Sequence, residues 1–192
     1  MLQPLAFLLQ LGGCKESLQQ ISVLFLNFQF CKKLGSSYNG KYVATPFTVM
    51  KIKEIELLSF GSLTTDTEEK ELNKNSPTGY FLYPDKIEFI DKTDKLQGVQ
   101  GLKFGIEYFI KGYNSSMNID VSFCCRILHP KLTNPMTNEQ FSETIETKRH
   151  YLNNINFDYL FFEYDWEVKT GIYTFQIIEN ECILLEKSFE IF

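Results

Sequence analysis

Two stretches of strict two-residue alternation constrain this chain more than any other feature. From Leu102 to Lys111 every second side chain is apolar, and the same alternation recurs from Met117 to His129. A period of two places one set of side chains in a core and the other in water, which is typical of half-buried β-strands. The intervening residues Gly112–Ser116 form turns readily and have the length of a hairpin loop. We therefore predict two strands joined by a hairpin.

The rest of the chain from Met50 onward favours further short strands separated by turns. The ranges with strand-like composition are 52–60, 80–91, 141–149, 160–168, 172–178 and 182–192. Thr64–Gly79 and His129–Pro135 are rich in turn-forming residues and are predicted to be loops, and the one helical turn expected lies near Thr137–Gln140. Glu179–Glu181 should turn a C-terminal hairpin. About seven to nine short strands with frequent turns predict an all-β fold, an immunoglobulin-like antiparallel β-sandwich.

Charge divides the chain into two parts. The net charge is −5, but residues 1–49 hold four Lys and one Glu, whereas the remainder holds 15 basic and 23 acidic residues. We expect 50–192 to be the folded domain and 1–49 to be an N-terminal extension, either disordered or upstream of a true start near Met50. An acidic domain without a basic stripe argues against nucleic-acid binding. The apolar runs fall short of the roughly 18 residues that a membrane span needs, so no transmembrane segment is expected.

Cysteine usage bears on the cellular compartment. The five cysteines are widely spaced, odd in number and contain no C-x-x-C pair, which favours a reducing compartment and a cytoplasmic protein. Cys124 and Cys125 are adjacent on a predicted strand, so their side chains should point to opposite faces, with at least one in the core. The alternative is a lipid anchor through Cys14 in the cell envelope, because Leu11–Cys14 resembles a lipoprotein cleavage box. A secretion signal begins with a positively charged region, however, and no Lys or Arg precedes Leu11.

The residue types that catalysis and metal binding need are scarce. His129 and His150 are the only histidines, and the chain has no Gly-x-Ser-x-Gly elbow and no glycine-rich phosphate loop. The Cys and His spacing does not suit zinc, and the acidic clusters lack the alternating oxygen ligands of a calcium loop. We therefore predict no catalytic residue, no metal site and no cofactor.

Three residues are the candidates for ligand contact: His129, Asn134 and Trp166. The first two belong to the proline-punctuated loop that should lie at one end of the sandwich, where such folds carry recognition. Trp166 belongs to an aromatic group that would form a binding platform if it were exposed: Tyr159, Phe161, Phe162, Tyr164 and Trp166. The alternative, which we favour, is that Trp166 is the core tryptophan of the sandwich.

Four segments resemble a bacterial family known only as domain of unknown function 3859. They are Gly101–Gly112, Arg126–Thr137, Trp166–Ile177 and Leu185–Ile191, and the resemblance in order and spacing covers about residues 50–192. Thr170 stands where that family more often has Pro before Gly. The resemblance implies an all-β domain and no assigned activity, cofactor or catalytic residue.

The function that these observations favour is a non-catalytic binding or protein-interaction module. Its partner would be a protein or a small molecule, and the chain would be a monomer or a weak homo-oligomer. Two alternatives remain. One is a hydrolase-type enzyme that uses loop carboxylates such as Asp165 and Glu167. The other is a structural subunit that pairs through a sheet edge, with Ile183–Phe192 as the candidate edge.

Overall fold

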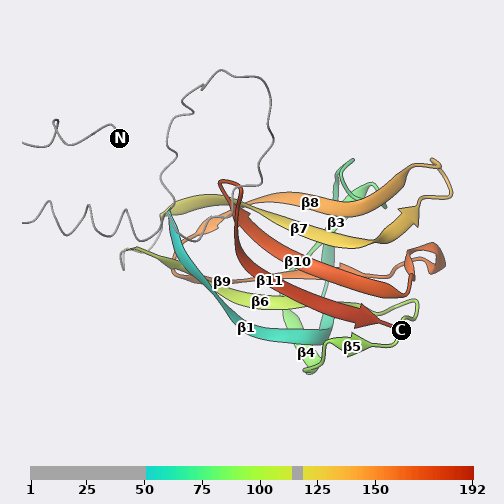
Figure 1. The fold of residues 1–192 in the computed structure, drawn as a ribbon, viewed down its shortest axis with the longest axis horizontal. Helices are drawn as coiled ribbons and strands as arrows, with labels where there is room; N and C mark the ends of the chain where they lie inside the picture. Colours follow the sequence, from blue (N-terminus) through green and yellow to red (C-terminus); the bar gives the residue numbers. More distant parts are fainter. Residues whose placement is uncertain (1–50, 114–118) are drawn as a thin grey trace, which may run out of the picture. The chain divides into compact units, whose positions relative to one another are not determined.

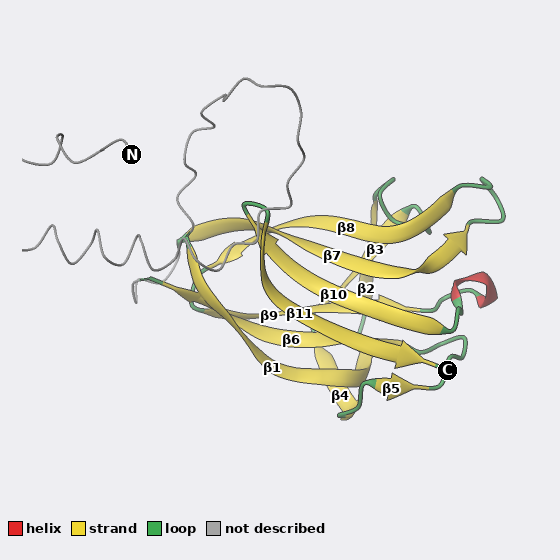
Figure 2. Cartoon of the chain, in the orientation of Figure 1, coloured by secondary structure: helices red, strands yellow, loops and turns green. Residues whose placement is uncertain are grey.

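The structure is a computed structural model that describes residues 51–113 and 119–192. Strands make up most of this part of the chain, and its single helix is a short 3-10 turn (Figure 2). In chain order the elements are β1 (Ile52–Thr65), β2 (Glu68–Leu72), β3 (Tyr80–Pro84), β4 (Ile87–Asp91), β5 (Lys95–Leu96), β6 (Lys103–Gly112), β7 (Asp120–Thr133), β8 (Gln140–Tyr151), β9 (Asn154–Phe161), η1 (Asp165–Glu167), β10 (Gly171–Glu179) and β11 (Cys182–Ile191). The predicted extension 1–49 and the candidate lipid anchor Cys14 lie outside the described residues.

Two sheets form the body of the domain. The four-stranded sheet has the order β4-β1-β6-β9, and the five-stranded sheet has the order β5-β11-β10-β7-β8. Figure 1 shows β7, β8, β10 and β11 as one layer, with β1, β6 and β9 in the layer that faces it. Strands β2 and β3 pair only with each other, as a separate hairpin. The predicted all-β sandwich is confirmed.

Aromatic side chains fill the space between the sheets. Phe104 and Phe123, from the two alternating stretches, are 0% and 3% exposed, so their predicted burial is confirmed. Four rings pack edge-on around Phe104 with centroids 5.3 to 6.1 Å away: Phe162, Tyr173, Phe175 and Phe189. Edge-to-face contacts add about 0.5 to 1.5 kcal/mol each beyond the burial of apolar area. Cys125 is buried and its neighbour Cys124 is half-buried, as adjacent strand positions require.

The predicted hairpin between the two alternating stretches is wrong. Strand β6 pairs with β1 and β9, whereas β7 pairs with β8 and β10 in the other sheet. Each strand has one apolar face, and the two faces are buried against each other when the strands lie in opposite layers. The connection therefore carries the chain from one sheet to the other. Most of it, residues 114–118, lies outside the described residues.

Two predicted strand ends are also wrong, because bulges let the strands continue. Strand β1 passes through Gly61, which has φ of +138° and where a Cβ would lie 1.8 Å from the carbonyl oxygen of Asp91. Strand β7 passes through Pro130, although His129–Pro135 was predicted to be a loop. The β7–β8 register shifts between Leu128 and Leu132, and such an irregularity accommodates a residue that has no N–H to donate.

The predicted loop Thr64–Gly79 contains a strand. Glu68–Leu72 pairs with Tyr80–Pro84 to form the hairpin β2–β3, despite the high charge of its first strand. The expected single strand 80–91 is divided into β3 and β4 by the turn after Pro84. A two-stranded hairpin is marginal alone, so β2–β3 depends on contacts with the sandwich.

The C-terminal hairpin is confirmed, whereas the aromatic segment differs from its prediction. Strands β10 and β11 pair with Glu179 opposite Cys182, and Asn180 and Glu181 both have positive φ, as a two-residue type I′ turn requires. The expected strand over 160–168 ends at Phe161 and gives way to η1. The described residues contain no helix with the length and hydropathy that crossing a membrane requires.

Candidate functional site

The inward face of β8 is polar, although β8 belongs to one layer of a sandwich. Thr144, Glu146, Lys148 and His150 alternate along the strand and are buried or half-buried, whereas Ile145 faces solvent. A sandwich strand normally places its apolar residues inward and its polar residues outward. The inverted pattern places ionisable groups between the two sheets at the edge of the five-stranded sheet.

Strand β9 repeats this inversion at the edge of the other sheet. Asn156 and Asp158 are buried on its inward side, at 5% and 4% exposure. The close approach of β9 to β6 depends on Gly105, where a Cβ would lie 2.1 Å from the carbonyl oxygen of Asp158. The absence of a side chain at Gly105 therefore helps to fix the position of the Asp158 carboxylate.

Lys148 connects the two polar faces. Its Nζ lies 2.5 Å from Asp158 Oδ1 and 3.5 Å from Glu146 Oε2, and it donates to the carbonyl oxygen of Phe157 at 3.3 Å. Tyr108 donates from the core to the other oxygen of Asp158 at 2.7 Å. Burial lowers the pKa of Lys148, but the carboxylates of Asp158 and Glu146 outweigh it and hold that pKa above its ordinary value. The three N–H donors of Lys148 thus have three oxygen neighbours within the protein.

The negative charge of Glu146 is stabilised less by Lys148 than the negative charge of Asp158 is. Burial raises its pKa, and the charge of Asp158 raises it further, although Lys148 and the hydroxyl of Tyr83 act in the opposite direction. Lys148 lies 1 Å closer to Asp158 than to Glu146. Glu146 therefore retains unused acceptor capacity on the inward side of β8.

The hairpin β2–β3 forms a roof over this polar strip. Tyr83 of β3 donates to Glu146 Oε1 at 2.9 Å, which ties the hairpin to β8. Tyr159 of β9 donates its hydroxyl proton to Glu68 Oε1 at 2.7 Å, and the same hydroxyl lies 3.3 Å from the carbonyl oxygen of Leu82, which ties the hairpin to β9. Beneath it lies a cleft of about 680 Å³, lined by β3, β8 and β9. We call this space the β8–β9 cleft.

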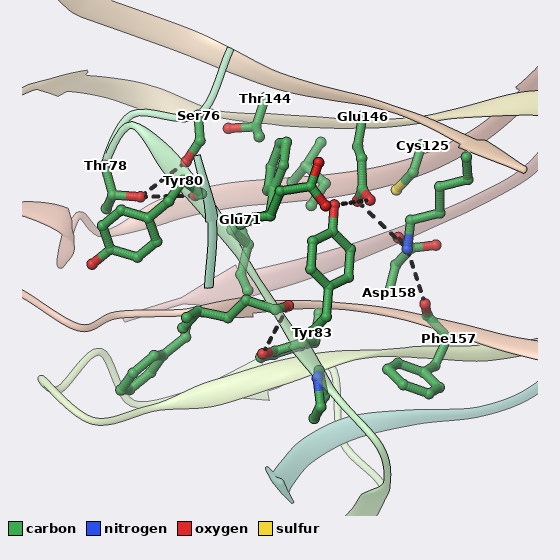
Figure 3. A pocket seen from close by; sticks show the side chains of 18 of the residues that line it. Glu71, Ser76, Thr78, Tyr80, Tyr83, Cys125, Thr144, Glu146, Phe157 and Asp158 are labelled. Carbon is green, nitrogen blue, oxygen red and sulfur yellow. Dashed lines mark hydrogen bonds and ion pairs between the residues drawn. The ribbon is translucent and has the colours of Figure 1, made fainter. Parts of the chain in front are cut away.

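Figure 3 shows how the labelled side chains are distributed in the β8–β9 cleft. Glu146, Asp158 and Cys125 gather on one side, and Ser76, Thr78 and Tyr80 gather on the other (Figure 3). The hydroxyl of Tyr80 bonds the Glu163 carboxylate and lies 3.2 Å from the hydroxyl of Tyr164. Burial and the bond to Glu163 raise the pKa of Tyr80 well above its ordinary value. Carboxylates and tyrosines therefore occur on both sides of the cleft.

Glu167 also lines the β8–β9 cleft, whereas Asp165, the other carboxylate proposed for catalysis, does not. Glu167 is buried, and its Oε2 accepts the N–H of Tyr164 at 2.8 Å. Burial raises the pKa of Glu167 to about 7, against the opposing effect of the backbone N–H groups of Tyr164 and Glu163. Asp165 is exposed. The two proposed catalytic carboxylates therefore do not face one cavity.

The structure does not bring the three predicted binding residues into one site. His129 lines the β8–β9 cleft, but its Nδ1 lies 2.9 Å from the carbonyl oxygen of Pro130 and its Nε2 lies 3.2 Å from Thr144 Oγ1. A carbonyl can only accept, so Nδ1 carries the proton and Nε2 accepts from Thr144. Burial lowers the pKa of His129, in agreement with a neutral ring.

Asn134 and Trp166 lie outside the β8–β9 cleft. Asn134 donates to the carbonyl oxygen of Pro77 at 2.9 Å and accepts the N–H of Met136 at 2.8 Å, so it connects the turn after β7 to the loop of the β2–β3 hairpin. Trp166 is half-buried in η1 and stacks on Tyr164 with centroids 6.1 Å apart. The favoured interpretation of Trp166 as the core tryptophan is wrong, since Phe162 and Tyr173 occupy the adjacent core. The roles of Asn134 and Trp166 as ligand contacts stay predictions.

Two further expectations can be compared with the described residues. Among those residues no group of three or more His, Cys, Asp or Glu side chains is placed to hold a metal ion. The candidate edge Ile183–Phe192 is partly covered, because β5 pairs in parallel with Glu190 and Ile191 of β11. The edges that border the cleft belong to β8 and β9, the last strands of their sheets in the described part of the chain.

Comparison with known proteins agrees with the fold. An immunoglobulin-like protein from Pseudomonas aeruginosa matches with a TM-score of 0.51 and 16% sequence identity, over 73% of this chain and 98% of that one. At this identity the likeness shows the fold alone, and the domain is an immunoglobulin-like β-sandwich. No family model matches the chain, and no curated protein matches it. Membership of the family known as domain of unknown function 3859 therefore stays a prediction.

Proposed function

We propose that this domain is a non-catalytic binding module that takes a small polar organic molecule into the β8–β9 cleft. The observation that carries the proposal is the inward-facing set of Glu146, Lys148 and Asp158 beneath a tyrosine-lined roof. A sandwich gains stability by burying apolar residues at these positions, and a buried ion pair is a poor substitute. A chain that keeps charges here, beside about 680 Å³ of space, has the features of a ligand site.

The size and construction of the cleft favour a small molecule over a folded protein partner. Ligand pockets occupy about 300 to 1,000 Å³ and combine apolar walls with a few convergent polar groups. The cleft fits that range, and core residues such as Ile127 and Phe162 supply apolar wall. Tyrosine hydroxyls tie the hairpin roof to β8 and β9, so polar groups border the cleft on both of these sides.

A screen of polar fragments by ligand-observed NMR on the full chain tests this proposal. The blocking variant is Asn154→Trp, because Asn154 is an exposed residue that lines the cleft and a larger side chain there leaves the core intact. The matched control is Ile172→Trp, at an exposed position of β10 outside the cleft. We expect fragments to bind the unmodified chain and Ile172→Trp but not Asn154→Trp. Absence of any binding fragment, or equal binding to both variants, would contradict the proposal.

A further inference from the structure

The charged residues that line the β8–β9 cleft are mostly acidic. Its acidic residues outnumber its basic ones, and the acidic residues are Glu71, Asp85, Glu146, Asp158, Glu163 and Glu167. The basic residues are Lys148 and Arg149. Lys148 already has three oxygen neighbours, and the guanidinium of Arg149 donates to Asp120 at 3.0 Å. Both basic residues of the lining are therefore already paired with carboxylates of the protein, which favours a cationic ligand over an anionic one.

Beside the β2–β3 hairpin, one of the chain's own ammonium groups is held by a carboxylate and an aromatic ring. Lys103 Nζ lies 2.8 Å from Glu68 Oε1 and 4.5 Å from the ring centroid of Phe161. Within the hairpin, Nζ of Lys70 on β2 lies 3.5 Å from the ring centroid of Tyr80 on β3. Aromatic faces attract ammonium groups, and a partly buried carboxylate strengthens the attraction. A carboxylate and an aromatic side chain, Glu146 and Tyr83, also line the cleft, where Lys148 Nζ lies 3.5 Å from Glu146 Oε2 but only 2.5 Å from Asp158 Oδ1.

We infer that the ligand of the β8–β9 cleft is an organic amine whose ammonium group pairs with Glu146, beside Tyr83. The inference rests on the proposed function and specifies the chemistry of its ligand. An ammonium donates hydrogen bonds and would add a positive charge beside Glu146, which shares Lys148 with Asp158, whereas a neutral polyol donates without that charge. A dicarboxylate would meet like charge from Glu146 and Asp158.

Three probes of equal chain length separate these chemistries. Butane-1,4-diamine, butane-1,4-diol and succinate differ only in their end groups, so each is titrated into the full ¹⁵N-labelled chain and followed by amide chemical shifts. We expect the diamine to bind most tightly, with the largest shifts in β3, β8 and β9. Tighter binding of the diol or of succinate would overturn the inference and leave the proposed function standing. Binding of none of the three would also overturn it, whereas the fragment screen judges the proposed function separately.

A matched pair of variants locates the ammonium. Glu146→Gln keeps the shape of the side chain and removes its charge, and Glu143→Gln makes the same change at an exposed position of β8 outside the cleft. We expect Glu146→Gln to weaken diamine binding by about tenfold or more, because a charge-assisted bond is lost. Glu143→Gln should change it less than about twofold. Equal effects of the two variants would mean that only the overall charge of the chain matters and would contradict the inference.

Discussion

The ammonium of Lys148 lies 2.5 Å from the Oδ1 of Asp158, and this ion pair joins the last strand of one sheet to the last strand of the other. The two side chains are largely shielded from solvent, with 12% and 4% of their area exposed. The pair occupies positions where apolar residues would close the sandwich. The pair therefore links the two sheets, and both of its residues line the polar cleft between them.

Removal of the cation from this pair should be costly. Lys148→Met keeps much of the aliphatic stem but leaves Asp158 buried without its charge partner, so we expect a loss of about 3 to 5 kcal/mol in the free energy of unfolding. The matched control is Lys111→Met, because Lys111 pairs with Glu54 at 3.4 Å on the surface. That change should cost less than about 1 kcal/mol. Urea denaturation measures both, and similar losses would contradict the structural role of the buried pair.

Gly105 should be intolerant of the smallest side chain. Gly105→Ala would place a Cβ 2.1 Å from the carbonyl oxygen of Asp158, and backbone must move to relieve the contact. We expect a loss of about 3 kcal/mol or more by thermal or chemical denaturation. Gly79→Ala is the comparison, since its Cβ meets nothing within 4 Å but its φ is +86°, so only backbone strain of about 1 to 2 kcal/mol applies. If Gly105→Ala lost less stability than Gly79→Ala, β9 could move away from β6 at little cost, and the prediction would be wrong.

Glu167 should make stability depend on pH between 4.5 and 7. Its folded pKa of about 7 lies above the ordinary value of 4.5, so the folded state keeps a proton that the unfolded state releases in this interval. Its contribution is complete below pH 4.5 and is lost as the pH rises through 7, by up to about 3 kcal/mol. The stability of Glu167→Gln relative to the unmodified chain should therefore rise across the interval. A flat difference, like that expected for the exposed-site control Glu143→Gln, would contradict the raised pKa.

Asn134 should prove structural when it is truncated. Asn134→Ala removes the bond to Pro77 and the cap on the N–H of Met136, so we expect a loss of about 1 to 2 kcal/mol in thermal denaturation. Asn75→Ala, at an exposed position of the hairpin loop, should stay within about 0.5 kcal/mol. If Asn134→Ala were equally neutral, the link between the β7–β8 turn and the hairpin roof would contribute little.

The alternation of Phe104 and Phe123 was sufficient to predict a sandwich core, because burial of alternate residues is a local property of a strand. It was not sufficient to pair the strands. Whether β6 and β7 form a hairpin or face each other across the core depends on which other strands flank them, and no local signal near Gly112 records this. The persistence of β1 through Gly61 and of β7 through Pro130 was missed for a related reason. At both places a β-bulge lets the strand keep its backbone hydrogen bonds, and the partner strands, β4 and β8, are separate segments of the sequence.

The candidate site was missed because its signal runs opposite to the usual one. Thr144, Glu146, Lys148 and His150 share one parity, and Ile145 falls on the other, but a polar parity is typical of the solvated face of a strand. Only the placement of β8 beside β9 turns that face inward and brings Lys148 to Asp158. His129 was predicted from the sequence as a ligand contact in a loop; the structure places it in strand β7, where it lines the cleft and both ring nitrogens have partners within the protein.

The most direct test of the account is to map where a bound fragment lies on the full chain. Amide chemical shifts of the ¹⁵N-labelled protein, recorded with the tightest fragment from the polar screen, report the location without any substitution. The account predicts that the largest changes cluster in β3, β8 and β9, around Tyr83, Glu146 and Asp158. Changes concentrated around Trp166, or on the outer face of β10 and β11, with the β8–β9 cleft unaffected, would contradict it.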